Sequence, residues 1–157
     1  NNDTGFSEGS GLENQISDYV ARLNIQPNEY ISYTQRVRID EDDLSFARHE
    51  VDLRFGGNEN WFSLGYLNLK DDQAAIGIES VHEITLAGQI KMTDYWSTYG
   101  GYRRDLEADS SIETLIGIQY LDECFGIALE ARREYTRDRD VEPETKIGVK
   151  IRLLPFN

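Results

Sequence analysis

Histidine and cysteine, the side chains whose ordinary pKa lies nearest neutral pH, are few in this chain. It contains two histidines, His49 and His82, and one cysteine, Cys124. A hydrolase of the serine type needs a hydroxyl, a histidine and an orienting group on one face. His82 and Glu83 cannot form such a pair, because adjacent residues of a strand point to opposite faces. We therefore expect no catalytic residues, and each histidine is interpreted as a surface or lumen residue.

The acidic run Asp40-Glu41-Asp42-Asp43 is the best candidate for a metal site by residue type. It lacks the glycine and the alternating spacing of a calcium-binding EF-hand loop. A run of like charges is usually a solvated turn. We therefore predict no metal and no cofactor.

Charge and length limit the class of protein. The chain has 157 residues and a formal net charge of −13, which disfavours nucleic acid as a partner. No window approaches the roughly 18 uninterrupted apolar residues of a transmembrane helix, although a transmembrane barrel, whose strands alternate, remains allowed. The first fifteen residues lack the basic start and apolar stretch of a signal peptide, so either a leader was removed or the chain is an excised piece.

Period-two alternation runs along nearly the whole chain. In the last segment Ile147, Val149, Ile151 and Leu153 share one face, and lysine, glycine and arginine alternate with them. Such alternation predicts strands with one apolar face. We expect about nine strands of roughly ten residues, the length that a tilted strand needs to cross a bilayer. Their approximate ranges are 18–26, 29–39, 46–55, 61–69, 82–92, 95–104, 112–120, 125–135 and 144–154. The predicted fold class is therefore all-β, an antiparallel meander that forms part of an outer-membrane β-barrel.

Short and long connections alternate along the chain. Short turns are expected near 26–28, 56–58, 93–94 and 122–123, and longer ones at 40–43, 70–80, 105–111 and 137–144. Outer-membrane barrels have short periplasmic turns and longer outer loops. This assignment places the C-terminus in the periplasm, residues 1–15 in a remnant of an extracellular loop, and residues 16–157 in the C-terminal strands of a larger barrel. The odd number of strands implies that others are missing, because single-chain bacterial barrels have even numbers.

Two sets of side chains support this picture. Aromatic residues that gather near strand ends suggest a membrane-boundary girdle: Tyr19, Tyr30, Tyr33, Trp61, Tyr66, Tyr95, Trp96, Tyr102, Tyr120 and Tyr135. Charged residues are expected on the inward face: Arg36, Arg38, Lys91, Glu130, Arg132, Lys150 and Arg152. A mixed-charge interior suits a hydrated lumen that passes an amphiphile or houses a plug protein.

Cys124 lies at one of the short turns. If that turn is periplasmic, the thiol is in a compartment where disulfides form, and its partner must lie outside this chain. The alternative is that Cys124 is only a small apolar residue at the start of a strand.

The sequence resembles the LptD family, the OstA-type lipopolysaccharide-assembly proteins of the outer membrane of Gram-negative bacteria. The resemblance spans roughly residues 9–154 and is carried by SGLENQISDYVARLNIQPNEYISYTQRVRID, YWSTYGGYRRDLEAD, YLDECFGIALEARREYTRD and PETKIGVKIRL. It implies a transporter rather than an enzyme. Lipopolysaccharide would arrive from a periplasmic LptA-like bridge and leave through a lateral opening between the first and last strands. A cysteine at position 124 would pair with one in the N-terminal periplasmic domain, although Phe125 stands where many members have a second cysteine.

The resemblance also implies partners and a gate. An LptE-like lipoprotein would plug the lumen, and the barrel-assembly machinery would insert the protein. The last strand would line the lateral gate with Ile147, Val149, Ile151 and Leu153. Pro155 follows it and cannot donate a hydrogen bond, which fits either an ordinary strand stop or early termination of pairing at the gate.

Two other classes remain open. One is a complete small outer-membrane barrel that serves as a receptor or adhesin. The other is a soluble acidic β-barrel or sandwich that binds a ligand or partner.

Overall fold

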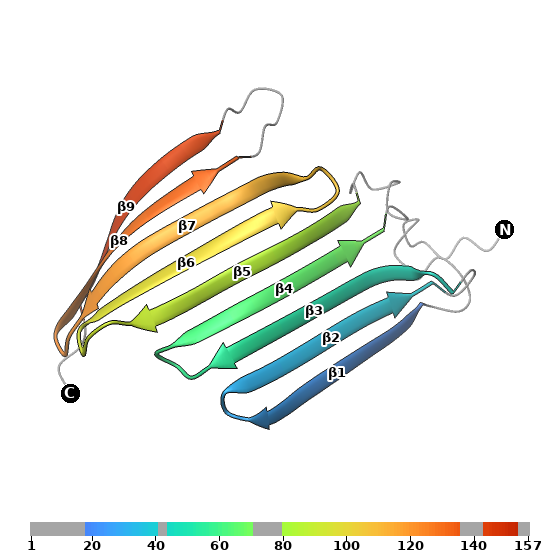
Figure 1. Ribbon diagram of the computed structural model, residues 1–157, viewed down its shortest axis with the longest axis horizontal. Coiled ribbons are helices and arrows are strands. Elements are labelled where there is room, and N and C mark those ends of the chain that lie inside the picture. The colour runs from blue at the N-terminus through green and yellow to red at the C-terminus, as the bar shows by residue number, and fades with distance from the viewer. Residues whose placement is uncertain (1–17, 41–43, 71–79, 136–142, 154–157) are drawn as a thin grey trace.

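A computed structural model describes residues 18–40, 44–70, 80–135 and 143–153, which form one antiparallel sheet. The strands are β1 (Tyr19–Asn28), β2 (Ile31–Ile39), β3 (Phe46–Gly56), β4 (Trp61–Leu69), β5 (Val81–Lys91), β6 (Trp96–Asp105), β7 (Ser110–Leu121), β8 (Phe125–Glu134) and β9 (Glu144–Leu153). Each strand pairs with its neighbours in sequence, so the order across the sheet is β1 to β9 (Figure 1). The predicted nine-strand meander is confirmed.

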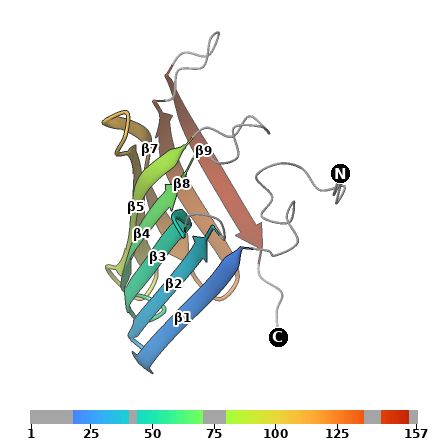
Figure 2. The same cartoon turned by 90° about the vertical axis from the view of Figure 1, so that its right-hand side faces the viewer.

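The sheet is a single curved layer and is not closed on itself. Figure 2 shows it curling from β1 at one free edge to β9 at the other. Ala47 is the one buried hydrophobic residue among those described. The described strands therefore enclose no apolar core of their own. Over the same residues, no helix has the length and apolar character needed to cross a membrane.

Side-chain caps explain why several turns are tight. Asp105 Oδ1 accepts hydrogen bonds from the backbone N–H groups of Glu107 and Ala108, at 2.8 and 2.9 Å. Thr93 Oγ1 accepts from the N–H of Trp96 at 3.1 Å. These are Asx- and Ser/Thr-type turns, in which a short polar side chain replaces a backbone acceptor. Gly56 has a φ of 100°, which a residue with a Cβ rarely adopts.

The structure corrects two of the predicted connections. Pro27 lies inside β1, where the register shifts between Ile25 and Asn28, and the turn falls at residues 29–30 instead. A bulge accommodates proline because the ladder already lacks a hydrogen bond there. The second connection, predicted at 105–111, comprises only residues 106–109, because both flanking strands extend into it. It is as long as the turn at residues 92–95. The predicted long connections all lie at one end of the sheet. Of these four, the connections at 40–45, 70–80 and 135–143 are longer than the one at 106–109.

Candidate functional site

Alternation gives the sheet two chemically distinct faces. On β2, Thr34, Arg36 and Arg38 lie on the face that lines a groove across β2 to β6, and we call this the concave face. Tyr33 and Val37 lie on the opposite, convex face. Residues directly opposite in an antiparallel pair share a face, so the printed register extends this division to all nine strands.

The convex face carries an exposed apolar surface. On β9, Ile147, Val149, Ile151 and Leu153 are 76%, 64%, 70% and 81% exposed. They lie opposite Ala131, Leu129, Ile127 and Phe125 of β8, so the predicted shared face of these residues is confirmed. Ile116 on β7 and Ile90 on β5 continue this surface, at 63% and 61% exposed. So much contiguous exposed apolar area marks a surface that meets lipid or another protein.

Ion pairs cross the concave face over β2 and β3. Arg36 Nη1 lies 2.7 Å from Glu50 Oε1 and 3.0 Å from Asp52 Oδ2. Arg48 reaches the other oxygen of Glu50 at 2.9 Å. The groove beside them is lined by charged and hydroxyl side chains together with Leu53, Leu64 and Leu67, and it is open to solvent.

A second polar network on the concave face joins β9 to the strands before it. Glu130 Oε2 accepts hydrogen bonds from Tyr99 Oη at 3.2 Å and from Lys150 Nζ at 2.9 Å. Arg132 lies 3.5 Å from Glu130 and 3.2 Å from Glu113. The Tyr99 ring covers Gly117, which is buried. The network therefore spans four strands, β6 to β9.

Tyr99 and Gly117 were missed by the sequence analysis. Both stand at polar-face positions of their strands, directly opposite each other in the register. A glycine in a strand interior often marks a place where another group approaches closely. That signal was present in the sequence, but only the pairing of β6 with β7 identifies the group.

The predicted inward charges are confirmed to share one face. Arg36, Arg38, Lys91, Glu130, Arg132, Lys150 and Arg152 all lie on the concave face by register. The whole chain has an excess of negative charge, but on the concave face arginines and lysines alternate with carboxylates.

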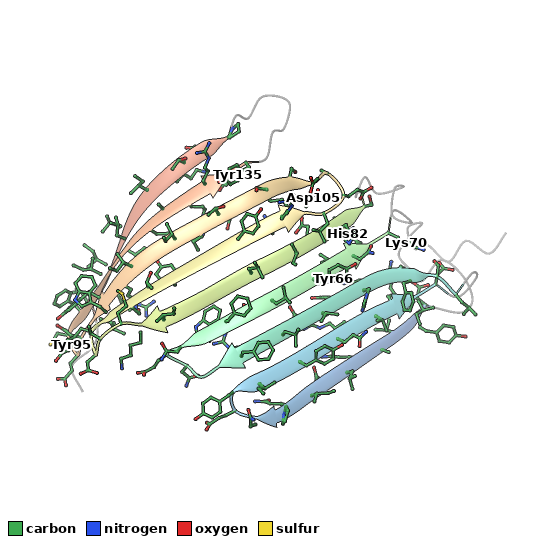
Figure 3. All side chains as sticks on the ribbon, in the orientation of Figure 1. Tyr66, Lys70, His82, Tyr95, Asp105 and Tyr135 are labelled. Carbon is green, nitrogen blue, oxygen red and sulfur yellow. The ribbon has the colours of Figure 1, made fainter. Side chains whose placement is uncertain are left out.

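Both histidines lie on the convex face. Gln35 Nε2 lies 3.0 Å from His49 Nε2, and Tyr66 Oη lies 3.0 Å from His82 Nε2. The Tyr66 ring makes edge contacts with both imidazoles, at centroid distances of 5.8 and 5.5 Å. Figure 3 shows His82 at the end of the sheet where Asp105 and Tyr135 also lie. Of the two interpretations, surface or lumen residue, the register favours the first, because both histidines lie on the face opposite the polar groove.

Aromatic side chains cluster on the convex face at the opposite end of the strands. Tyr120 contacts Tyr95, Trp96 and Phe125, at centroid distances of 5.9, 5.2 and 5.5 Å. Figure 3 shows Tyr95 at this end of the sheet. Trp61 departs from the predicted girdle, because its register partner Gln89 places it on the concave face, where Arg54 stacks 4.2 Å from its ring centroid.

Cys124 is exposed in the turn between β7 and β8. Its backbone N–H donates to Asp122 Oδ1 at 2.7 Å, and the N–H of Phe125 donates to the same oxygen at 3.1 Å. These two hydrogen bonds, first that from Cys124, lower the pKa of the Asp122 carboxyl below its usual value. The turn is therefore held by a carboxylate, and Cys124 is exposed beside it.

Several predicted features fall outside the described residues. These are the loop remnant at 1–15, Glu41 to Asp43 of the acidic run, most of the long connections at 70–80 and 137–144, and Pro155 after the last strand. Within the described ranges, no group of three histidine, cysteine or acidic side chains is arranged to hold a metal ion.

Comparison with known families decides the class of the chain. The family model of LptD, described as LPS transport system D, matches residues 1–96. The chain belongs to the LptD family. Its relatives are transport and assembly proteins rather than enzymes.

Curated relatives carry the same family name. LPS-assembly protein LptD of Aliivibrio fischeri is 24% identical over 140 residues, which cover 79% of this chain and 18% of the relative. LPS-assembly protein LptD of Pseudoalteromonas translucida is 31% identical over 104 residues, 65% of this chain and 13% of the relative. The match thus corresponds to less than a fifth of the length of either LptD protein, although it covers most of this chain.

Proposed function

We propose that this chain forms the C-terminal strands of a larger outer-membrane β-barrel that transports lipopolysaccharide to the outer leaflet. One observation carries the proposal: a curved sheet of an LptD-family chain has an exposed apolar convex face and an ionic concave face. A transmembrane barrel needs this distribution, since its outer face meets lipid and its lumen holds water. The free edges at β1 and β9 would pair with further strands and so close the barrel.

The arrangement in the membrane follows from the connections. The short turns, including the one with Cys124, would face the periplasm, and the C-terminus would lie on that side. Residues 1–15 would belong to an extracellular loop, and residues 16–157 to the C-terminal part of the barrel. The ring clusters at the two ends of the convex face, around Tyr66 and around Tyr120, support strands that span a membrane, because such side chains favour the membrane–water boundary.

Strand β9 would form one side of a lateral gate. Among the nine described strands it pairs with β8 alone, so its other edge is available to the first strand of the complete barrel. Ile147, Val149, Ile151 and Leu153 would face lipid along this seam, and Pro155 would end its ladder. A seam with few hydrogen bonds opens at lower free-energy cost than the interior of the sheet.

The concave face and the turn at Cys124 each imply partners of the complete protein. The concave face would surround an LptE-like lipoprotein plug and the passing lipopolysaccharide. A periplasmic domain of the complete protein would connect to an LptA-like bridge, and a cysteine of that domain would form a disulfide with Cys124. Insertion of the barrel would need the barrel-assembly machinery.

Depletion of the full-length protein that contains this chain tests the function. In depleted cells, we expect lipopolysaccharide to disappear from the surface of intact cells, measured with an antibody to its outer sugars. Re-expression of the full-length gene should restore the signal, and an unrelated outer-membrane protein measured in parallel should stay constant. An unchanged surface signal after complete depletion would contradict the proposal.

A further inference from the structure

Arginines face one another directly on the concave face of β1 to β3. Arg22 of β1 lies opposite Arg36 of β2, and Arg38 of β2 lies opposite Arg48 of β3. We call these four residues the arginine patch. Like charges directly opposite each other on neighbouring strands destabilise a sheet. Two such pairs side by side therefore need either compensating acids or a bound anion.

Acidic neighbours compensate the patch only in part. Arg36 and Arg48 share the carboxylate of Glu50, and Arg36 also reaches Asp52. Arg38 lies 3.1 Å from Asp18. The partner that the structure gives Arg22 is the side-chain oxygen of Asn24, at 3.2 Å, which is neutral.

The like-charge pair near the last strand is a useful contrast. There Arg132 lies opposite Lys146, but each cation contacts two carboxylates. Arg132 contacts Glu113 and Glu130, and Lys146 contacts Glu134 and Glu144. Among the described residues, the ion pairs thus give each cation of that pair two carboxylates, whereas three carboxylates, those of Asp18, Glu50 and Asp52, pair with the four arginines of the patch.

Part of the patch is accessible to a ligand, although Arg38 is only 21% exposed. The side chains of Arg36 and Arg48 are 39% and 49% exposed, and Arg36 lines the groove together with the hydroxyl-bearing Ser32 and Thr34. Planar guanidinium groups bind phosphate through paired hydrogen bonds, and the Ser32 hydroxyl can donate to a remaining oxygen. The Thr34 hydroxyl already donates to Asn24 Oδ1 at 3.0 Å.

We infer that the arginine patch binds a phosphate group of the transported glycolipid as it passes along the concave face. The inference rests on the proposed transport function and adds to it a site and a chemical class of contact. An anion between the paired arginines offsets their repulsion, so the empty site is less stable than the occupied one. The groove then retains the phosphorylated part of the glycolipid while the apolar chains contact other surfaces.

A binding measurement on the purified full-length protein tests the site. The probes are lipopolysaccharide, the same lipopolysaccharide after chemical removal of its phosphates, and inorganic pyrophosphate. We expect the wild type to prefer the phosphorylated form by about tenfold or more, as charge-assisted hydrogen bonds allow. The Arg22→Gln/Arg38→Gln variant should lose this preference. Arg133→Gln should keep it, because Arg133 lies on the convex face over the Tyr135 ring.

A stability measurement guards against a variant that fails to fold. Arg22→Gln alone removes one of the facing charges and breaks no ion pair that the structure gives Arg22. Without ligand, we expect its thermal unfolding midpoint to rise above that of the wild type, because the repulsion is relieved. Added lipopolysaccharide should raise the midpoint of the wild type more than that of this variant. A midpoint that falls without ligand would overturn the inference.

The remaining outcomes separate this inference from the proposed function. If the wild type binds no form of lipopolysaccharide, both are overturned. If it binds both forms equally, or if the double variant keeps the preference, only the arginine site is overturned. Pyrophosphate that binds as tightly as lipopolysaccharide would assign the patch to a free anion instead. If the double variant loses a co-purifying lipoprotein but keeps the preference for phosphate, the patch belongs to a protein partner.

Discussion

Gly117 allows the Tyr99 ring to lie flat on the concave face. A Cβ at position 117 would overlap the ring, since it would lie 2.6 Å from Tyr99 Oη and 2.7 Å from Cε2. Tyr99 in turn donates to Glu130, which also binds Lys150 of the last strand. One glycine on β7 therefore supports a network that reaches β9.

Gly117→Ala should lower the free energy of unfolding by about 1–3 kcal/mol, because overpacking forces a tyrosine out of its rotamer. Gly148→Ala is the matched control, because a Cβ there has no atom within 4 Å. That variant should be neutral or slightly stabilising. The measurement is urea unfolding of the full-length protein in detergent micelles. Equal stability of the two variants would refute the role given to Gly117.

At the scale of the element, β9 has an apolar face, which would meet lipid in the proposed barrel, and a polar face, which would meet water. Val149 lies on the convex face opposite Leu129, and the adjacent Gly148 lies on the concave face opposite Glu130. Both stand near the middle of the strand, so their positions differ in face and hardly in depth. This pair of residues can report which face of the sheet meets lipid.

Val149→Arg should reduce folding into lipid vesicles by about 2–4 kcal/mol, which is the cost of a cation on the lipid face at the bilayer midplane. Gly148→Arg adds the same charge to the hydrated face and should fold nearly as well as the wild type. The folded fraction can be read from gel mobility without heating. If both variants fold equally, the convex face does not meet lipid.

At the scale of the whole molecule, the described strands are an incomplete enclosure. The curved sheet has two free edges, and Cys124 is the only cysteine of the chain. A disulfide at Cys124 would need a second cysteine from another part of the protein, and closure of the proposed barrel would need strands beyond the nine described. In the proposed arrangement, the exposed turn at Cys124 would be the point of covalent attachment to the periplasmic part.

Outer-membrane extracts of the full-length protein should show a gel mobility shift when reductant is added. The shift should disappear in Cys124→Ser and remain in Glu123→Ser, which alters the same turn but keeps the thiol. Identical mobility with and without reductant would refute the disulfide. Extraction into buffer without detergent would refute the membrane placement.

The sequence by itself determined the strands and their faces. Alternation depends on the local geometry of a strand, where successive side chains point to opposite sides, so nine strands and the shared face of Arg36, Lys91 and Arg152 could be predicted. The position of Pro27 could not, because a bulge is a feature of the pairing between two strands. His49 and His82 have the parity of the apolar positions on their strands, so alternation places them on the apolar face, and only the register shows that Tyr66 lies between them.

Only the tertiary structure decided which residues meet across strands. The contact of Tyr99 with Gly117 and the facing arginines of β1 to β3 depend on register, which brings together residues far apart in the chain. A shift by one residue would exchange the two faces of a strand, and a shift by two would separate these pairs while leaving the alternation intact. The sequence therefore specified which side chains lie on each face of a strand. The register between strands decided which of those side chains contact one another.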